Sequence, residues 1–266
     1  MNIIVCVKQV LDPEIPAAKF KIDAKAKRVI PPEGIPPVIN PYDAQAVELA
    51  LRLKEQHGGK ITLLTLSDDG GDKVVKHALS MGADEGVVLS DEAFSGSDSF
   101  ATAYILARAV QRVGDYDLVL CGRQAADWDE GLVGSLLAQI LDLPLVTLAK
   151  AIEVEENQLK VTRVILNGYQ EFSVTLPAVI TVSNEVGQAR LPSGWGIISA
   201  ARKQIPVWKA ADIGADLSRV GSEAALRKLQ QLFIPSRERS CKIVPGESAA
   251  EAAAKLATEL REAGAI

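Results

Sequence analysis

Histidine and cysteine, which supply most metal ligands and many nucleophiles in proteins, are scarce in this chain. It has two histidines, His57 and His77, and three scattered cysteines, Cys6, Cys121 and Cys241. Both histidines fall in expected helices, where solvated positions are more common than catalytic ones. No cysteine spacing matches a metal site, and an odd number of cysteines argues against a disulfide framework. We therefore expect no bound metal and a reducing compartment, the cytoplasm of a bacterium or an archaeon.

Basic clusters and long apolar runs are also missing. The net charge is −5 and no basic block occurs, so nucleic acid is not an expected partner. No apolar run is long enough to span a bilayer, so an integral membrane protein is not expected. The apolar segment 2–10 has no basic leader and is expected to be a strand rather than a signal peptide. Zinc, nucleophile-elbow and Walker A motifs are lacking too, so we assign no catalytic residue.

Hydrophobic residues make up 48% of the 266 residues, enough for a sizeable core. Strand-like and helix-like segments alternate through the first 145 residues. The expected strands are 2–10, 61–66, 86–89 and 117–121, and the expected helices are 42–57, 72–81, 99–113 and 130–141. Such alternation predicts an α/β protein, an αβα sandwich with a mainly parallel sheet.

The pattern changes after residue 150. Residues 151–182 alternate without a long helix, which predicts antiparallel strands that extend the same sheet. Residues 184–200 form an expected loop with an apolar patch, either partner-binding surface or a loop packed on its own body. We expect one nucleotide-binding domain over 1–205. Residues 206–266 are expected to form an irregular arm, with a short helix near 222–231 and a longer one over 248–263, which wraps another subunit.

The stretch 117–135 organises the rest of the chain. Its apolar start, DLVLC, breaks at Gly122, crosses a polar loop and enters a helix near Gly131. A helix N-terminus after a parallel strand is a site for phosphate, because its N–H groups are unpaired and its dipole is positive there. Gly131, Gly134 and Ser135 would allow close approach of a phosphate, while the acidic residues 127, 129 and 130 would hold ribose hydroxyls or cap the helix. An ordinary strand–helix turn is the alternative.

Several motifs, in order along most of the chain, resemble the β subunit of electron transfer flavoprotein. They are Val5-Cys6-Val7-Lys8-Gln9-Val10, Asn40-Pro41-Tyr42-Asp43, Met81-Gly82-Ala83-Asp84, Gly122-Arg123-Gln124-Ala125-Ala126-Asp127 and Leu176-Pro177-Ala178-Val179-Ile180-Thr181. The resemblance implies an adenine-nucleotide α-hydrolase-like, Rossmann-like fold and a heterodimer with an α subunit. It also implies that the α subunit holds most of one FAD, and that electrons pass from acyl-CoA dehydrogenase-type flavoenzymes to a quinone oxidoreductase or another acceptor.

The resemblance further implies a second adenine nucleotide inside this subunit. It is AMP in simple electron shuttles and FAD in bifurcating members, where it takes hydride from NADH. The loop Asp127-Trp128-Asp129-Glu130-Gly131 follows neither form, but Arg123, Val133-Gly134 and the run Gly96–Thr102 favour FAD. The implied nucleotide-binding residues are Cys6, Val7, Asn40, Asp68, Ser99, Thr102, Arg123, Gln124, Ala126, Asp127, Asp129, Gly131, Leu132, Val133, Gly134 and Ser135.

Three alternatives stay open at these positions. Cys6 either borders adenine or is a buried core thiol. Trp128, which replaces a glycine of the family, either fills the space of a flavin or stacks on a ring. Leu191, Trp195 and Ile197 are implied to contact the partner dehydrogenase, and either Leu191 or Trp195 takes the place of the family's leucine anchor. A protein that binds or hydrolyses ATP on the same fold is the alternative from another class, although residues 10–13 after the first strand lack the glycines that a triphosphate loop needs.

Overall fold

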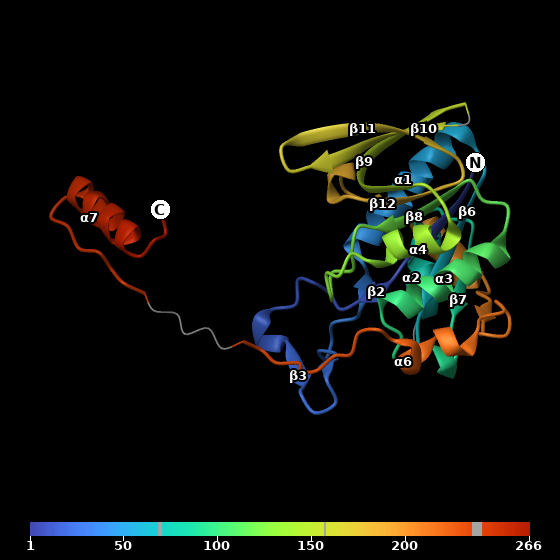
Figure 1. Cartoon of the computed structure of the whole chain (residues 1–266), viewed down its shortest axis with the longest axis horizontal. Helices are drawn as coiled ribbons and strands as arrows, with labels where there is room; N and C mark the ends of the chain where they lie inside the picture. The colour runs from blue at the N-terminus through green and yellow to red at the C-terminus, as the bar shows by residue number, and fades with distance from the viewer. Residues whose placement is uncertain (69–70, 157, 236–240) are drawn as a thin grey trace. The chain divides into compact units, whose positions relative to one another are not determined.

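A computed structural model describes residues 1–68, 71–156, 158–235 and 241–266 of the chain (Figure 1). The chain divides into two compact units, Met1–Gln231 and Leu232–Ile266. The first unit carries the sheet and all of the site residues expected from the sequence. The second unit carries one helix, α7 (Ala249–Glu262), close to the helix expected over 248–263.

The first unit is built on a nine-stranded sheet with the order β11-β10-β9-β12-β8-β1-β6-β7-β13. The seven strands from β9 to β13 in this order run parallel to one another. Strand β10 is antiparallel to both β9 and β11. The bounds are β1 (Asn2–Cys6), β6 (Lys60–Leu66), β7 (Glu85–Leu89), β8 (Leu118–Gly122), β9 (Leu145–Glu155), β10 (Gln158–Ile165), β11 (Gly168–Thr175), β12 (Ala178–Val182) and β13 (Val207–Trp208).

Helices cover both faces of this sheet, and two apolar cores lie between the layers (Figure 1). One face packs against α1 (Pro41–His57), α2 (Gly71–Met81) and α5 (Gly194–Arg202). The other face packs against α3 (Ser99–Val113) and α4 (Val133–Leu141). The expected αβα sandwich is therefore confirmed.

The strand order reverses at β1. The chain moves from β1 to β6 and β7 on one side, and then crosses back to β8 on the other side of β1. Helices α1 and α2 lie on one face and α3 and α4 on the other, so the crevice at the carboxyl ends of β1 and β8 is the topological switch point of the sheet. Open α/β sheets bind their ligands at such a point.

Two strand expectations need correction. The segment 2–10 is not one strand: β1 ends at Cys6, and β2 (Gln9–Val10) leaves the sheet to pair with β5 (Val38–Ile39). Strand β12 was expected to be antiparallel but runs parallel to both β8 and β9. All five residues of β12 are buried, as is typical of a central parallel strand covered on both faces. A separate antiparallel hairpin consists of β3 (Lys21–Asp23) and β4 (Arg28–Ile30).

The segment 184–231 is more ordered than its sequence suggests. The expected loop contains α5, and Ser193 caps that helix by accepting a hydrogen bond from the Gly196 N–H. Residues 206–231, expected to be part of an arm, belong to the first compact unit. Strand β13 pairs with β7, and Ala210, Ile213 and Val220 join the core beneath α3. Only α6 (Gly221–Ala224) forms where a helix over 222–231 was expected.

Candidate functional site

The candidate site lies at the carboxyl ends of β1 and β8. Cys6 and Cys121 are register partners near the carboxyl ends of these two strands. Both belong to the core on the α3 and α4 face. The hydrogen bond with Cys6 and burial raise the pKa of the Cys121 thiol well above its usual value. Cys6 is therefore a buried core thiol that also lies at the switch point. A core position and a position beside a bound adenine are thus compatible for this residue.

Asn40 holds the loop after β8 in place through hydrogen bonds of its side chain. Its side chain is buried, and its amide donates to the Gln124 carbonyl at 2.8 Å and accepts from the Ala126 N–H at 3.1 Å. The Asn40 N–H donates to the Lys8 carbonyl at 2.8 Å, so the loops after β1 and β8 are joined through one residue. The structure thus brings Asn40, Gln124 and Ala126 together, as the site hypothesis requires.

Asp43, in the first turn of α1, is a second buried residue that binds both loops. The site predicted from the sequence did not include it. Its carboxylate accepts from the Lys8 N–H at 2.7 Å and from the Gly122 N–H at 3.1 Å. Burial raises the pKa of Asp43 to about 7, although the backbone donors act in the opposite direction. Gly122 must be glycine here, because a Cβ atom would lie 2.3 Å from the Asp43 carboxylate and 2.8 Å from the Tyr42 backbone.

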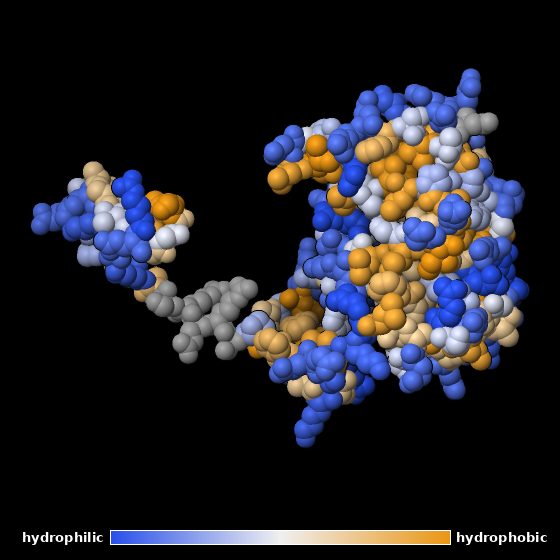
Figure 2. All heavy atoms as spheres, in the orientation of Figure 1, coloured by the Kyte–Doolittle hydropathy of each residue, from blue (hydrophilic) through white to orange (hydrophobic). Residues whose placement is uncertain are grey.

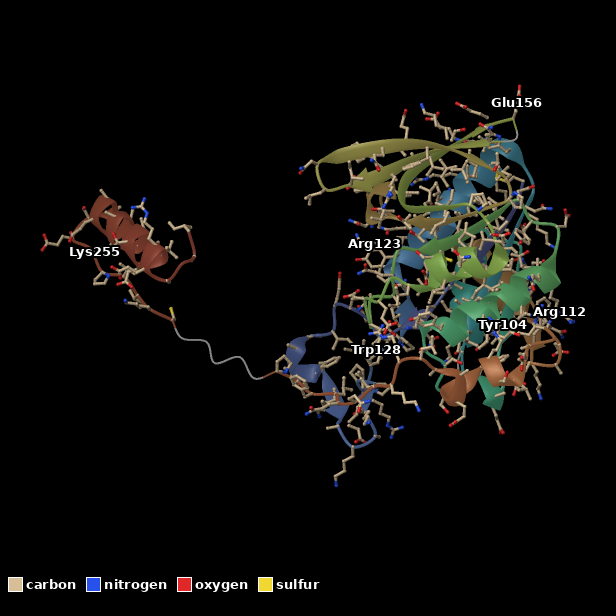
Figure 3. The ribbon with its side chains drawn as sticks, viewed as in Figure 1. Tyr104, Arg112, Arg123, Trp128, Glu156 and Lys255 are labelled. Atoms are coloured by element: carbon tan, nitrogen blue, oxygen red, sulfur yellow. The ribbon has the colours of Figure 1, made fainter. Side chains whose placement is uncertain are left out.

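Arg123 connects the loop after β8 to the end of β12. Its N–H donates to the Val182 carbonyl at 3.0 Å, and its guanidinium donates to the side chains of Gln124 at 3.1 Å and Asn184 at 3.4 Å. The guanidinium also lies 5.6 Å from the centre of the Tyr42 ring. Figure 2 shows the first unit hollowed between the β9–β11 ribbon and the β3–β4 hairpin, and Figure 3 shows Arg123 on the side of that hollow.

The acidic residues of the loop do not cap α4. The N-cap is Leu132, which has no side-chain oxygen to offer. Asp127 instead accepts from Lys8 Nζ at 2.7 Å, and Asp129 accepts from Gln124 Nε2 at 2.6 Å. The capping alternative for these residues is therefore wrong. The first turn of α4 keeps N–H groups that its own N-cap side chain does not satisfy, and such groups suit an anion.

Gly131 and Gly134 have different roles at the start of α4. Gly131 has a φ of +63°, a turn conformation that side chains rarely allow. Gly134 is buried, and a Cβ atom there would lie 2.5 Å from Cγ2 of Thr181 on β12. Gly134 thus allows close packing of α4 on the sheet rather than approach of a phosphate to the backbone. Val133 packs against the core beside it, and Ser135 is half-buried in the same turn.

The start of α3 also reaches the loop after β8. Asp98 caps α3, accepting from the N–H groups of Phe100 and Ala101 at 3.0 Å each. The Ser99 hydroxyl donates to the Glu130 carboxylate, which also binds Arg227 at 2.8 Å. Thr102 is half-buried in the next turn of α3. Ser99 therefore lies next to the loop after β8, to which it is joined through Glu130.

Three expected residues lie apart from this hydrogen-bonded set. Val7 packs into the core on the opposite face, with α1 and α2, and only its backbone lies at the site. Asp68 is exposed after β6 at the same edge of the sheet. Trp128 is 51% exposed, so its indole does not fill the interior of the site (Figure 3).

The expected partner surface lies on and before α5. Leu191 and Trp195 are each 84% exposed, and Ile197 and Ile198 are exposed beside them. We call these four residues the α5 patch. Ile198 lies three residues after Trp195, which places it on a neighbouring part of the same helix.

Arg190 anchors the α5 patch to α1. Its guanidinium binds Glu48 at 2.7 Å and Glu55 at 2.5 Å, and its N–H donates to Glu48 at 3.2 Å. Arg52 binds the same Glu48 carboxylate at 2.8 Å and donates to the Val186 carbonyl at 3.1 Å. The Glu48 side chain is only 6% exposed, and the arginines hold its pKa below the usual value despite burial.

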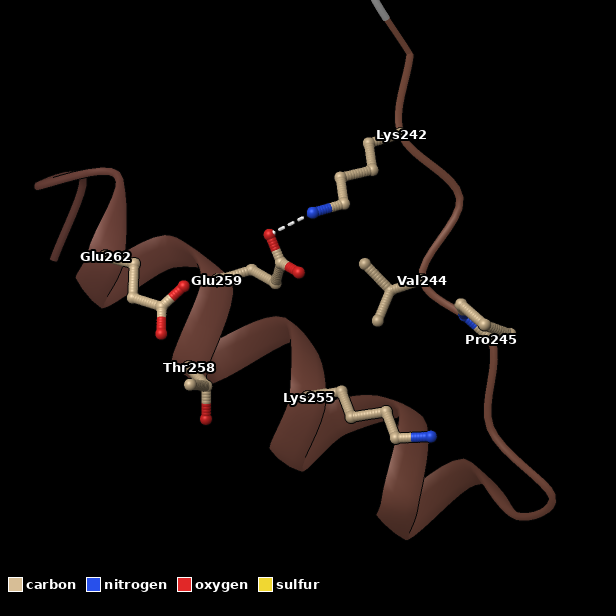
Figure 4. A pocket seen from close by; sticks show the side chains of 7 residues that line it. All are labelled: Lys242, Val244, Pro245, Lys255, Thr258, Glu259 and Glu262. Carbon is tan, nitrogen blue, oxygen red and sulfur yellow. Dashed lines mark hydrogen bonds and ion pairs between the residues drawn. The ribbon is translucent and has the colours of Figure 1, made fainter.

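Two cavities lie away from the candidate site. One, of about 270 Å³, lies within the second unit between α7 and residues 242–245, and is lined mostly by charged side chains (Figure 4). The other, of about 140 Å³, lies at the amino ends of β1 and β6, beside Asn2, Lys60 and Glu85. Neither contains a residue of the site hypothesis. Across the described residues, no helix combines the length and apolarity needed to cross a bilayer.

Sequence reasoning missed Lys8, Asp43, Thr181 and Arg227. Asp43 stands in the Asn40-Pro41-Tyr42-Asp43 motif, and an acidic residue in the first turn of a helix after a strand is a usable signal. Arg227 lies almost a hundred residues from Glu130, and nothing in the local pattern indicates that the two meet.

The reversed strand order and the residues gathered at its switch point define a doubly wound α/β protein of the Rossmann-like class. The electron transfer flavoprotein domain matches residues 29–213 of the chain. The electron transfer flavoprotein subunit beta of Thermoanaerobacterium thermosaccharolyticum is 37% identical over 92% of this chain and 93% of its own length. The caffeyl-CoA reductase-Etf complex subunit CarD of Acetobacterium woodii is 36% identical over 98% of each chain, and protein FixA of Azorhizobium caulinodans is 34% identical over 89% of this chain and 85% of its own.

This chain therefore belongs to the electron transfer flavoprotein family, as its motifs predicted, and electron transfer is its role at that level.

Proposed function

We propose that this chain is the β subunit of a heterodimeric electron transfer flavoprotein and that it holds an adenine nucleotide at the switch point between β1 and β8. One observation carries the proposal: the first turn of α4, with Leu132 as its N-cap, opens directly beyond the carboxyl end of β8. Its backbone N–H groups and positive dipole suit the phosphate of a nucleotide. Asn40 and Asp43 hold the adjoining loops in place.

The residues present fit such a nucleotide. Backbone N–H groups of α4 and the Ser135 hydroxyl would bind phosphate, while Ser99 presents a second hydroxyl from α3. The nearby carboxylates of Asp127 and Asp129 are paired with Lys8 and Gln124, which reduces their repulsion of an anion. A flavin bound here would supply the redox chemistry, and this chain would position it and tune its electronic properties.

We favour FAD over AMP in this site. The contact between Ser99 and Glu130 shows that the start of α3 lies within reach of the loop before α4, where a longer nucleotide would extend. The exposed Trp128 leaves the interior free, so the indole is available to stack on a ring. The relation to a subunit of a caffeyl-CoA reductase-Etf complex supports a role beyond a simple shuttle. A bifurcating complex that oxidises NADH is the function that FAD in this site would imply.

The partners in this proposal are an α subunit, a flavoenzyme donor of the acyl-CoA dehydrogenase type, and a quinone oxidoreductase or another acceptor. The α5 patch is the proposed contact with the donor, because four apolar side chains there are exposed while Arg190 fixes the segment to α1. The names of the relatives, which include an electron transfer flavoprotein subunit beta, support the α partner.

The deciding experiment is the flavin and AMP content of the purified complex, measured by acid release and chromatography. Two FAD per heterodimer without AMP would support the FAD form, and oxidation of NADH would then be measured. One FAD and one AMP would overturn the FAD form and leave a simple shuttle. A complex with no nucleotide beyond the flavin of the α subunit would overturn the nucleotide site itself. Hydrolysis of ATP by the chain alone would favour the ATP-handling alternative.

A further inference from the structure

The two thiols at the candidate site form a side-by-side pair. Cys6 and Cys121 are register partners on neighbouring parallel strands, whose backbones lie about 4.8 Å apart. Both side chains belong to the same core, on the α3 and α4 face. Side chains of register partners that face the same side of a sheet stand next to each other, so the two sulfur atoms can approach closely enough to bind one atom between them.

The pair lies at the edge of the core rather than inside it. The preceding residues on the same face, Ile4 and Val119, are 1% and 0% exposed. Cys6 and Cys121, at the switch-point end of the two strands, are 7% and 5% exposed, slightly more than these neighbours. A Cβ atom on Gly134 would lie 3.5 Å from the Cys121 Cβ, which places the thiol directly beneath the first turn of α4.

The surroundings of Cys6 and Cys121 determine which thiol reagents can react with them. The hydrogen bond and burial raise the pKa of Cys121, so reagents that need a free thiolate react slowly there. A trivalent arsenical needs two adjacent thiols rather than an ionised one. Cys241 is exposed and, lying in the other unit, reacts as a single thiol.

We propose that Cys6 and Cys121 form a dithiol site that takes up trivalent arsenicals when no nucleotide is bound, and that this modification prevents nucleotide binding. Phenylarsine oxide would form two As–S bonds, one to each sulfur, while its oxygen leaves as water with the two thiol protons. No electron is transferred and no other reactant is needed. The protection by nucleotide rests on the proposed function, since the nucleotide would cover the switch-point end of the strands that carry both thiols.

The test uses the full-length chain in the complex in which it purifies, with Cys241→Ser to remove the exposed thiol. Nucleotide is released, and the protein is treated with one equivalent of phenylarsine oxide, with and without added AMP or FAD. We expect one phenylarsenic group per chain, detected as an intact-mass adduct that has lost one water. We expect at least a tenfold lower yield with nucleotide and a loss of nucleotide binding after modification, both reversed by a dithiol reagent.

Cys6→Ser and Cys121→Ser, each added to Cys241→Ser, are the matched controls. Each single-thiol variant should lose the stable adduct while its circular dichroism stays that of the parent. No adduct on the folded, nucleotide-free parent, or equal adducts on both single-thiol variants, would overturn the dithiol site. An adduct that forms equally with nucleotide bound would overturn the coupling between the thiols and the nucleotide. Nucleotide content before treatment tests the proposed function separately.

Discussion

Asn40 holds the loop after β8 with both ends of its buried amide. Replacing it by alanine leaves the Gln124 carbonyl and the Ala126 N–H without their partner. We expect Asn40→Ala to lower the free energy of unfolding by about 2–3 kcal/mol and to lower nucleotide content, because buried polar groups would lose their hydrogen bonds. Denaturant unfolding and chromatography of released nucleotide measure the two effects.

Asn2→Ala is the matched control for this prediction. Asn2 lies at the opposite edge of the sheet, where its amide binds Asp115 in an exposed position. Its loss should cost less than about 1 kcal/mol and leave nucleotide content unchanged. Equal effects of the two substitutions would show that Asn40 has no special role at the site.

Asp43 makes stability depend on pH. Burial raises its folded-state pKa to about 7, above the ordinary value of 3.8. Between these values the folded chain keeps a proton that the unfolded chain releases, so the free energy of unfolding falls as pH rises from about 4 to about 7. The contribution is lost by up to about 1.4 kcal/mol per pH unit and is constant above pH 7.

Asp43→Asn removes this titration. The difference in unfolding free energy between the native chain and Asp43→Asn should therefore change across pH 4–7 and level off above pH 7. Denaturant unfolding at a series of pH values measures it. A difference that does not vary with pH would mean that the Lys8 and Gly122 N–H groups keep Asp43 ionised.

At the residue scale, the motif resemblance supplied a set of predicted site residues but not the contacts among them. In the structure Asn40 is hydrogen-bonded to Ala126 and Ser99 to Glu130, while the binding role of these residues stays a prediction. The expected strand over 2–10 already implies that Val7 faces the side opposite to Cys6, because successive side chains of a strand alternate. The sequence could not show the side-chain pairings of Asp127 and Asp129, which depend on a loop with no regular period.

The segment carrying α5 illustrates the scale of the element. Arg190 ties it to α1 through Glu48 and Glu55, while the α5 patch stays exposed. We expect Arg190→Ala to lower stability by about 1–2 kcal/mol, because the nearly buried Glu48 carboxylate loses one of its two cationic partners. Binding to the donor flavoenzyme should weaken as well, because the patch would no longer be held in place.

Trp195→Ala separates binding from stability. The side chain is 84% exposed, so its removal should leave the thermal midpoint unchanged while weakening donor binding at least tenfold. Calorimetric titration with the donor and thermal unfolding measure the two quantities. A donor affinity that is unchanged in Trp195→Ala would rule out the α5 patch as the docking surface.

Element types followed local patterns well, and element pairing did not. Helices α1, α2 and α3 begin and end within about one residue of their expected bounds, because caps, glycine stops and apolar period agree. The direction of β12 was predicted wrongly because a short apolar run does not indicate which strands it will pair with. Helix α5 was missed because two glycines near its start resemble a loop.

At the scale of the whole molecule, the two units differ in how much apolar core they contain. The first unit, Met1–Gln231, contains both cores and the candidate site. No residue of α7 in the second unit is buried. We therefore expect a chain ending at Gln231 to keep the thermal midpoint and nucleotide content of the full chain, but to associate more weakly with an α subunit.

Thermal unfolding, released nucleotide and co-purification with the α subunit test this truncation together. A fall of more than about 4 °C in the midpoint would show that the second unit stabilises the first. Undiminished association would show that the binding surface for the α subunit lies wholly within Met1–Gln231.

The sequence by itself determined the fold class, the family and the stretch around which the candidate site forms, because periodicity, helix caps and ordered motifs are local properties of the chain. Tertiary structure alone decided the switch point between β1 and β8, the pairing of Cys6 with Cys121 and the pairing of Glu130 with Arg227. These features join segments that are 97 to 115 residues apart in the numbering, and such distant segments meet only in the folded chain.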